Sequence, residues 1–82
     1  MYKYETKGVC SSEIFFDIKE GKLYNVQFEG GCNGNLKALS LLVEGMDASE
    51  AVKKLKGINC GLRPTSCGDQ LARAIEAALE SA

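Results

Sequence analysis

Three runs within the first 30 residues alternate side chains in the way that strands with one buried face do. Each run places one set of residues on a single face: Tyr2, Tyr4 and Thr6; Ile14, Phe16 and Ile18; Tyr24, Val26 and Phe28. Glu20-Gly21, between two lysines, favours a tight hairpin turn. The pattern therefore predicts a three-stranded antiparallel meander with one side against a core.

The remainder of the chain follows a helical period. It predicts a helix ending at Gly45, a second from Asp47-Ala48-Ser49-Glu50 (which resembles a capping box) to Gly57, and a third from about Cys67 to Leu79. The residues expected to face inward are Leu36, Leu39, Leu42 and Val43; Ala48, Ala51, Val52 and Leu55; and Leu71, Ala74, Ile75, Ala78 and Leu79. We expect one α+β domain over residues 1–82, with the meander packed against about three helices.

Size and charge narrow the function classes. A chain of 82 residues has a marginal core, and small domains often add a disulfide, a metal or a partner subunit, which here could be a second copy of the chain. The net charge of −1 and the absence of a basic stripe argue against nucleic acid as a ligand. The sequence contains neither a signal-peptide pattern nor an apolar run long enough for a membrane span, so we expect a cytoplasmic protein.

Four cysteines and no histidine are the most informative chemical feature of the sequence. Cys10, Cys32, Cys60 and Cys67 lie beside turn-forming or capping residues rather than within apolar runs. Cytoplasmic thiols stay reduced, so this usage favours metal or redox chemistry over a disulfide framework.

The predicted topology brings these cysteines toward one end of the sheet. The first strand ends near Cys10 and the third ends near Cys32, so both cysteines belong to the same end of the meander. Cys67 opens the last helix, with Ser66 or Cys67 itself as N-cap, and Cys60 lies in the preceding loop. A helix N-terminus favours a thiolate. We therefore predict a four-cysteine site for zinc or an iron–sulfur cluster, two metals that the sequence does not separate.

Simpler interpretations stay open. The thiols could be small buried hydrophobes, and a Cys60–Cys67 disulfide is geometrically allowed. Asp69 is interpreted as a first-turn carboxylate favoured by the helix dipole. Without histidine or paired carboxylates there are few candidates for general acid–base catalysis, so we assign no catalytic residue.

Thr65-Ser66-Cys67-Gly68-Asp69 resembles the Thr-Ser-Cys-Pro-Asp motif that names the TSCPD domain, with Gly68 in place of proline. The resemblance continues through Gly30–Leu36, Val43–Met46 and Leu55–Gly61, so it covers nearly the whole chain, and it points to the small stand-alone four-cysteine members of that family. A similar domain ends the adenosylcobalamin-dependent ribonucleotide reductases. The resemblance thus implies a ribonucleotide reductase or another protein as partner, and thiol exchange by Cys60 and Cys67 in deoxyribonucleotide synthesis. The chain is too short to hold the reductase barrel, so it would not act as a ribonucleoside-diphosphate reductase alone.

The order of elements also resembles the U-type iron–sulfur cluster assembly scaffolds. In these, one cysteine follows an early strand, a second precedes a helix, and a third opens an alanine-rich last helix; Cys10, Cys32 and Cys67 occupy the matching places. Ser66 replaces the scaffolds' histidine, and Ser11-Ser12 replaces their aspartate. The resemblance implies a similar fold, with Cys60 as the added ligand. Three functions remain: a metal-binding module, a thiol-redox accessory, and an interaction domain with incidental thiols.

Overall fold

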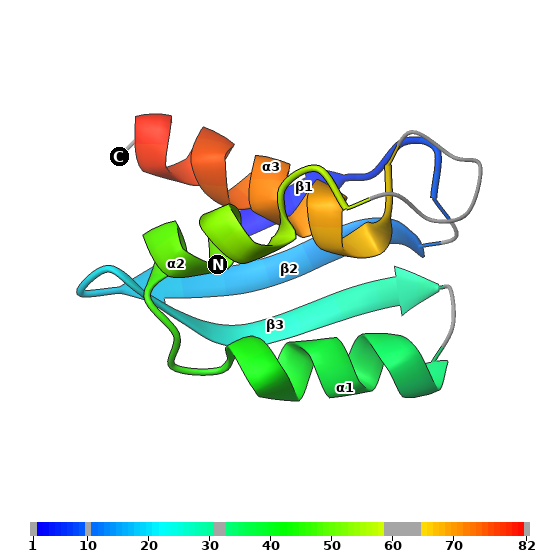
Figure 1. Ribbon diagram of the computed structural model, residues 1–82, viewed down its shortest axis with the longest axis horizontal. Helices are drawn as coiled ribbons and strands as arrows, with labels where there is room; N and C mark the ends of the chain where they lie inside the picture. The colour runs from blue at the N-terminus through cyan, green and yellow to red at the C-terminus, as the bar shows by residue number, and fades with distance from the viewer. Residues whose placement is uncertain (1, 10, 31–32, 59–64, 82) are drawn as a thin grey trace.

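A three-stranded sheet followed by three helices makes up the described part of the chain. The computed structural model describes residues 2–9, 11–30, 33–58 and 65–81. The strands are β1 (Tyr2–Glu5), β2 (Ser11–Lys19) and β3 (Lys22–Gly30), and the helices are α1 (Asn33–Val43), α2 (Ala48–Leu55) and α3 (Cys67–Ser81). Neighbouring strands pair antiparallel in the order β1-β2-β3 (Figure 1). The predicted α+β fold is therefore confirmed.

The β2–β3 hairpin closes through the predicted turn. Lys19 pairs with Lys22, and the two residues between them, Glu20 and Gly21, have φ values of 51° and 77°. Positive φ at both central positions is the geometry that follows the natural twist of a hairpin. The turn thereby sets the register that aligns the two long strands.

One face of the sheet carries the core, and the helices supply its other layer. Buried apolar side chains of the strands pack against those of the helices: Ile14, Phe16, Leu23 and Val26 against Val43, Ala48, Ala51, Leu71, Ala74, Ile75 and Ala78. In Figure 1, α1 lies along β3, while α2 and α3 lie side by side. The opposite face carries an ion pair of 2.8 Å between Lys3 and Glu13, together with the half-buried Phe15. The molecule is thus a two-layer sandwich with one open sheet face.

A bulge in β3 changes which residues reach the core. Phe15 pairs with Gln27 but Asp17 pairs with Tyr24, so β3 holds one extra residue at Asn25, whose φ is 56°. An extra residue reverses the alternation of side chains. Leu23 is therefore buried with Val26, and the prediction that Tyr24 shares that face was wrong.

The apolar stripe of α1 is narrower than predicted. Leu36 and Val43 are buried and Leu39 is half-buried, but Leu42 is 73% exposed. At 3.6 residues per turn, Leu42 lies about 120° around the helix from Leu36, whereas Val43 lies only about 20° away. The expectation that Leu42 belongs to the core was wrong. Leu79, in the last turns of α3, is likewise 41% exposed.

The start of α2 depends on backbone pairing rather than on the predicted capping box. Asp47 makes no side-chain cap hydrogen bond. Instead, Asp47 forms an antiparallel bridge with Lys22, and the Ala48 N–H donates to the Gly21 carbonyl at 2.8 Å. The hairpin turn thus satisfies a helix N–H that a capping side chain would otherwise take.

Truncation of Leu71 in α3 and of Leu42 in α1 should distinguish a core position from a surface position. We expect Leu71→Ala to lower the free energy of unfolding by about 3 kcal/mol. Leu71 is 0% exposed, so its truncation removes buried apolar surface and leaves a cavity in the core. Leu42→Ala should change the free energy of unfolding by less than about 0.5 kcal/mol. Chemical denaturation of both variants checks this, and equal losses would contradict the assigned helix face.

Candidate functional site

Cys67 is the one predicted ligand that lies within the described residues. It is the first residue of α3 and only 9% exposed. Its Sγ lies 3.2 Å from the Oγ of Ser11, which opens β2 and is 2% exposed. Two chain segments separated by 56 positions therefore meet at this thiol.

A second bulge selects the serine that reaches Cys67. Ser11 pairs with Gly30 but Glu13 pairs with Glu29, so β2 carries one extra residue between these pairs. The reversed alternation buries Ser11 and leaves Ser12 exposed, where its hydroxyl donates to the Glu29 carbonyl at 3.3 Å. Without the bulge, Ser12 would share the face of Ile14.

The N-cap of α3 is Ser66, one of the two residues that the sequence offered for this position. Its Oγ accepts a hydrogen bond of 3.1 Å from the Asp69 N–H, and its carbonyl accepts one of 2.8 Å from the Gln70 N–H. The cap fixes the first turn, where the unpaired N–H groups and partial positive charge of a helix lie. Cys67 is the first residue of this turn.

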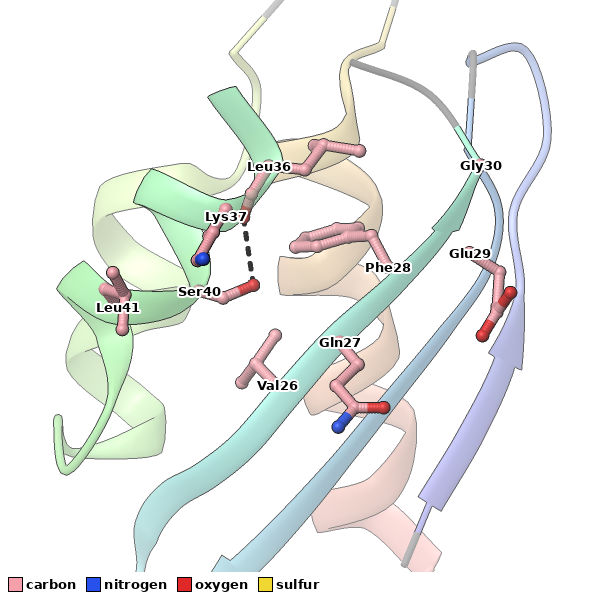
Figure 2. A pocket seen from close by; sticks show the side chains of 9 residues that line it. All are labelled: Val26, Gln27, Phe28, Glu29, Gly30, Leu36, Lys37, Ser40 and Leu41. Carbon is pink, nitrogen blue, oxygen red and sulfur yellow. Dashed lines mark hydrogen bonds between the residues drawn. The ribbon is translucent and has the colours of Figure 1, made fainter. Parts of the chain in front are cut away.

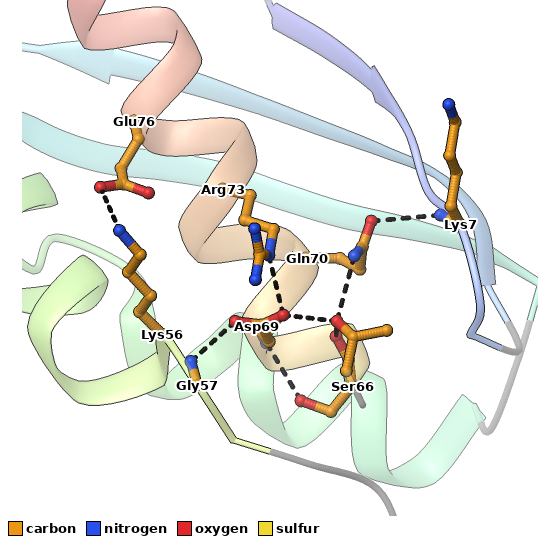
Figure 3. Close-up of polar contacts among 9 residues, drawn as sticks. Lys7, Lys56, Gly57, Ser66, Asp69, Gln70, Arg73 and Glu76 are labelled. Carbon is orange, nitrogen blue, oxygen red and sulfur yellow. Dashed lines mark hydrogen bonds and ion pairs between the residues drawn. The ribbon is translucent and has the colours of Figure 1, made fainter. Parts of the chain in front are cut away.

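A buried carboxylate joins the first turn of α3 to the segment before it. Asp69 is 0% exposed and accepts hydrogen bonds from the Gly57 N–H at 2.7 Å, from the Thr65 hydroxyl, and from Arg73 Nε at 2.9 Å (Figure 3). Burial alone would raise the pKa of Asp69, but these three donors outweigh it and lower that pKa to about 2. The side chain is therefore an ionised anchor rather than a solvated first-turn carboxylate.

Gln70 extends this network to the connection between β1 and β2. Its Oε1 accepts from the Lys7 N–H at 3.1 Å, and its Nε2 donates to Thr65 Oγ1 at 3.0 Å (Figure 3). A single turn of α3 thus holds the loop before β2 as well as the segment that follows α2.

The described neighbours of all four cysteines lie at this end of the molecule. Ser11 follows position 10 and is the ladder partner of Gly30, which precedes 31–32. Gly57 and Thr65, on either side of 59–64, both bond to Asp69. Cys10, Cys32 and Cys60 lie outside the described residues, so the meeting of four sulfur atoms stays a prediction. Residues 2–9, 11–30, 33–58 and 65–81, which include one of the four cysteines, contain no cluster of three metal-ligating side chains.

Sequence reasoning placed Asp69 correctly in the first turn of the last helix, but it missed the buried anchoring role of Asp69 and the contact of Ser11 with Cys67. A signal for the role of Asp69 was present, since Arg73 lies four residues after Asp69 on the same face of α3, and Thr65 lies four residues before it in the segment that precedes the helix. Ser11 had no such signal, because only the bulge distinguishes it from Ser12.

Gly68 replaces the motif's proline without displacing the helix start. It is buried, and a Cβ built there would lie 3.5 Å from Leu55 Cδ2, an ordinary van der Waals contact. The capped first turn therefore forms around glycine.

The fold and this turn define a small α+β domain with a buried cysteine at the capped N-terminus of its last helix. The chain belongs to the TSCPD domain family, whose model matches residues 2–79. No curated protein and no solved structure matches the chain. Within the described ranges, no helix has both the length and the apolar character needed to span a bilayer.

The Asp69 network should make stability depend on acid pH. The pKa of Asp69 is about 2 in the folded chain and about 3.9 in an unfolded one, so its stabilisation is complete above about pH 5 and is lost as pH falls toward 2. We expect Asp69→Asn to cost about 2–3 kcal/mol at pH 7 and to flatten this acid dependence.

Denaturation of both proteins between pH 2 and 7, with an NMR titration of the Asp69 carboxyl, checks this expectation. Asp47→Asn is the matched control, because Asp47 is exposed and makes no cap hydrogen bond. Its cost at pH 7 should stay below about 0.5 kcal/mol. An Asp69 carboxyl that titrates as in a denatured chain would contradict the anchor role.

Proposed function

We propose that the chain is a metal-binding module in which Cys10, Cys32, Cys60 and Cys67 hold zinc or an iron–sulfur cluster. The observation that carries this proposal is that Ser11, Gly57 and Thr65 contact the first turn of α3, and that Gly30 is the strand partner of Ser11. Each of the four cysteines lies within three positions of one of these residues or in that turn itself. Four thiolates are a donor set that suits both kinds of centre.

Covalent continuity supports the proposal by limiting how far each cysteine can be from Cys67. Adjacent Cα atoms are about 3.8 Å apart. Cys10 is bonded to Ser11, whose hydroxyl lies 3.2 Å from Cys67 Sγ. Cys32 is two positions from Gly30, the ladder partner of Ser11. Cys60 is three positions from Gly57, whose N–H is bonded to Asp69.

The surroundings of Cys67 suit a thiolate ligand. A metal-bound thiolate has no proton, so the Ser11 hydroxyl would act as the donor in their contact. The N-terminus of α3 adds its partial positive charge to the same sulfur. Both effects offset part of the negative charge that four thiolates bring to a metal.

A closed four-thiolate zinc site has no open coordination position, so its role would be structural or part of a docking surface. A cluster would instead serve electron transfer or cluster delivery. In either case the metal would tie the loops before β2, before α1 and before α3 to one point, and its binding would be coupled to folding.

Anaerobic purification of the full chain, followed by assays of zinc, iron, sulfide and reactive thiols, tests the proposal. One zinc per chain, with thiols masked until chelation, supports a zinc site. Iron with sulfide and visible absorption supports a cluster. A metal-free protein in which two thiols cycle readily between dithiol and disulfide would replace the proposal with the thiol-redox role. Four thiols that bind no metal and do not cycle would leave an interaction domain as the remaining function.

Each of Cys10→Ser, Cys32→Ser, Cys60→Ser and Cys67→Ser should lower both metal content and melting temperature of the loaded protein, because metal binding contributes to folding. The apo forms of the variants at neutral pH serve as controls for effects on the polypeptide itself. Unchanged metal content in any one variant would remove that cysteine from the ligand set.

Ser11→Ala should weaken metal affinity about tenfold, the size of effect usual for a hydrogen bond to a metal ligand. Competition with a chromophoric chelator measures the affinity. Ser12→Ala is the matched control, since Ser12 is adjacent, exposed and bonded to Glu29 instead of Cys67. Equal affinities of the two variants would remove Ser11 from this role.

A further inference from the structure

A groove runs between α1 and the outer side of β3. It has a volume of about 470 Å³ and is lined by five consecutive residues of β3, Val26 to Gly30, and by Leu36, Lys37, Ser40 and Leu41 of α1 (Figure 2). A groove over the face of a strand would be lined by alternate residues, because successive side chains point to opposite faces. Consecutive lining residues indicate that the groove follows the strand's edge.

The first half of this edge is already occupied by the chain itself. Leu23 exchanges backbone hydrogen bonds with the α1–α2 connection, donating to the Met46 carbonyl at 2.9 Å and accepting from the Gly45 N–H at 2.7 Å. The Asn25 N–H donates to the Glu44 carboxylate at 2.9 Å. The connection therefore pairs with β3 up to the bulge.

The second half of the edge has no such cover. Among the described residues, Val26 to Gly30 make no backbone–backbone hydrogen bond beyond the strand ladder. An edge strand presents outward N–H and C=O groups that can pair with another extended segment. The groove thus combines unused backbone groups with an apolar wall.

The side chains around the groove indicate the character of its occupant. Val26, Phe28, Leu36 and Leu41 supply apolar surface, and Leu41 is 69% exposed. Lys37 lies over the same space and forms no ion pair with any residue in the described part of the chain. Figure 2 shows the Glu29 carboxylate on the other side of the β3 ribbon from α1. The one charge facing the occupant from α1 is therefore positive.

We propose that this groove binds an extended peptide segment of a partner protein, which adds as a strand to the outer edge of β3. Main-chain pairing with β3 supplies affinity, alternate apolar side chains fill the space beside Phe28 and Leu41, and an acidic group pairs with Lys37. Gly30 is the last residue of β3 that lines the groove, so the bound segment reaches within two positions of Cys32 in the sequence.

A library of random twelve-residue peptides, displayed on phage and selected against the reduced full-length chain, tests this proposal. We expect enrichment of alternating apolar sequences that contain an aspartate or glutamate. Fluorescence anisotropy with an enriched synthetic peptide then gives its dissociation constant. N-methylation at alternate residues should abolish binding in one register and spare it in the other, because only one set of peptide N–H groups pairs with the strand.

Matched variants locate the site. Leu41→Ser should weaken binding by at least about tenfold, whereas Leu42→Ser should leave it unchanged, since Leu42 is 73% exposed but does not line the groove. Lys37→Glu should also weaken binding. Lys54→Glu should not, because Lys54 is an exposed residue of α2 and does not line the groove.

Three results would overturn the proposal. One is the absence of any peptide enriched above the empty-surface control. Another is an enriched peptide whose affinity survives Leu41→Ser and both N-methylated registers. The third is self-association of the chain that Leu41→Ser disrupts, detected by sedimentation, which would assign the edge to a second copy of the chain instead.

Discussion

The buried carboxylate of Asp69 is the interaction on which the arrangement of this end of the molecule depends. A carboxylate taken out of water is strongly destabilising unless donors surround it. Gly57, Thr65 and Arg73 provide those donors, two of them from outside α3. Folding therefore cannot bury Asp69 without also fixing the end of α2 and the residues before α3. One side chain thereby sets where the segment between Gly57 and Thr65 begins and ends.

Gln70 and Ser11 extend this constraint to the sheet. Gln70 holds the Lys7 backbone, and Ser11 contacts Cys67 while pairing with Gly30. The segments around Lys7, Ser11, Gly57 and Thr65 thus all bond to or contact the same helical turn, and Gly30 joins them through its pairing with Ser11. A metal site assembled from remote loops needs such positioning, because loops that were free to move would lose conformational entropy on binding and reduce affinity.

Much of this fold follows from local patterns in the sequence. The hairpin at Glu20-Gly21, the end of α1 before Gly45 and the start of α3 at Cys67 were predicted because turn, cap and period signals agree there. Leu42 and Tyr24 were misplaced for two different reasons. Leu42 fits a loose helical stripe but falls outside the narrow contact of α1 with the sheet, and Tyr24 follows an alternation that the bulge at Asn25 interrupts. Bulges and partner faces are tertiary features, so no local pattern specifies them.

The same limit applies to the candidate site. Topology alone predicted that the segments bearing cysteines approach one end of the sheet, and the described flanking residues do so. It did not predict that a bulge would bury Ser11 against Cys67, or that β3 would keep half of its edge unpaired. These two features meet at one strand pair, since Ser11 pairs with Gly30 and Gly30 also lines the groove. A strand added along β3 would therefore act on the residue that positions Ser11. Coupling between the proposed peptide and the proposed metal site would pass through that pair, and it would have to be reciprocal.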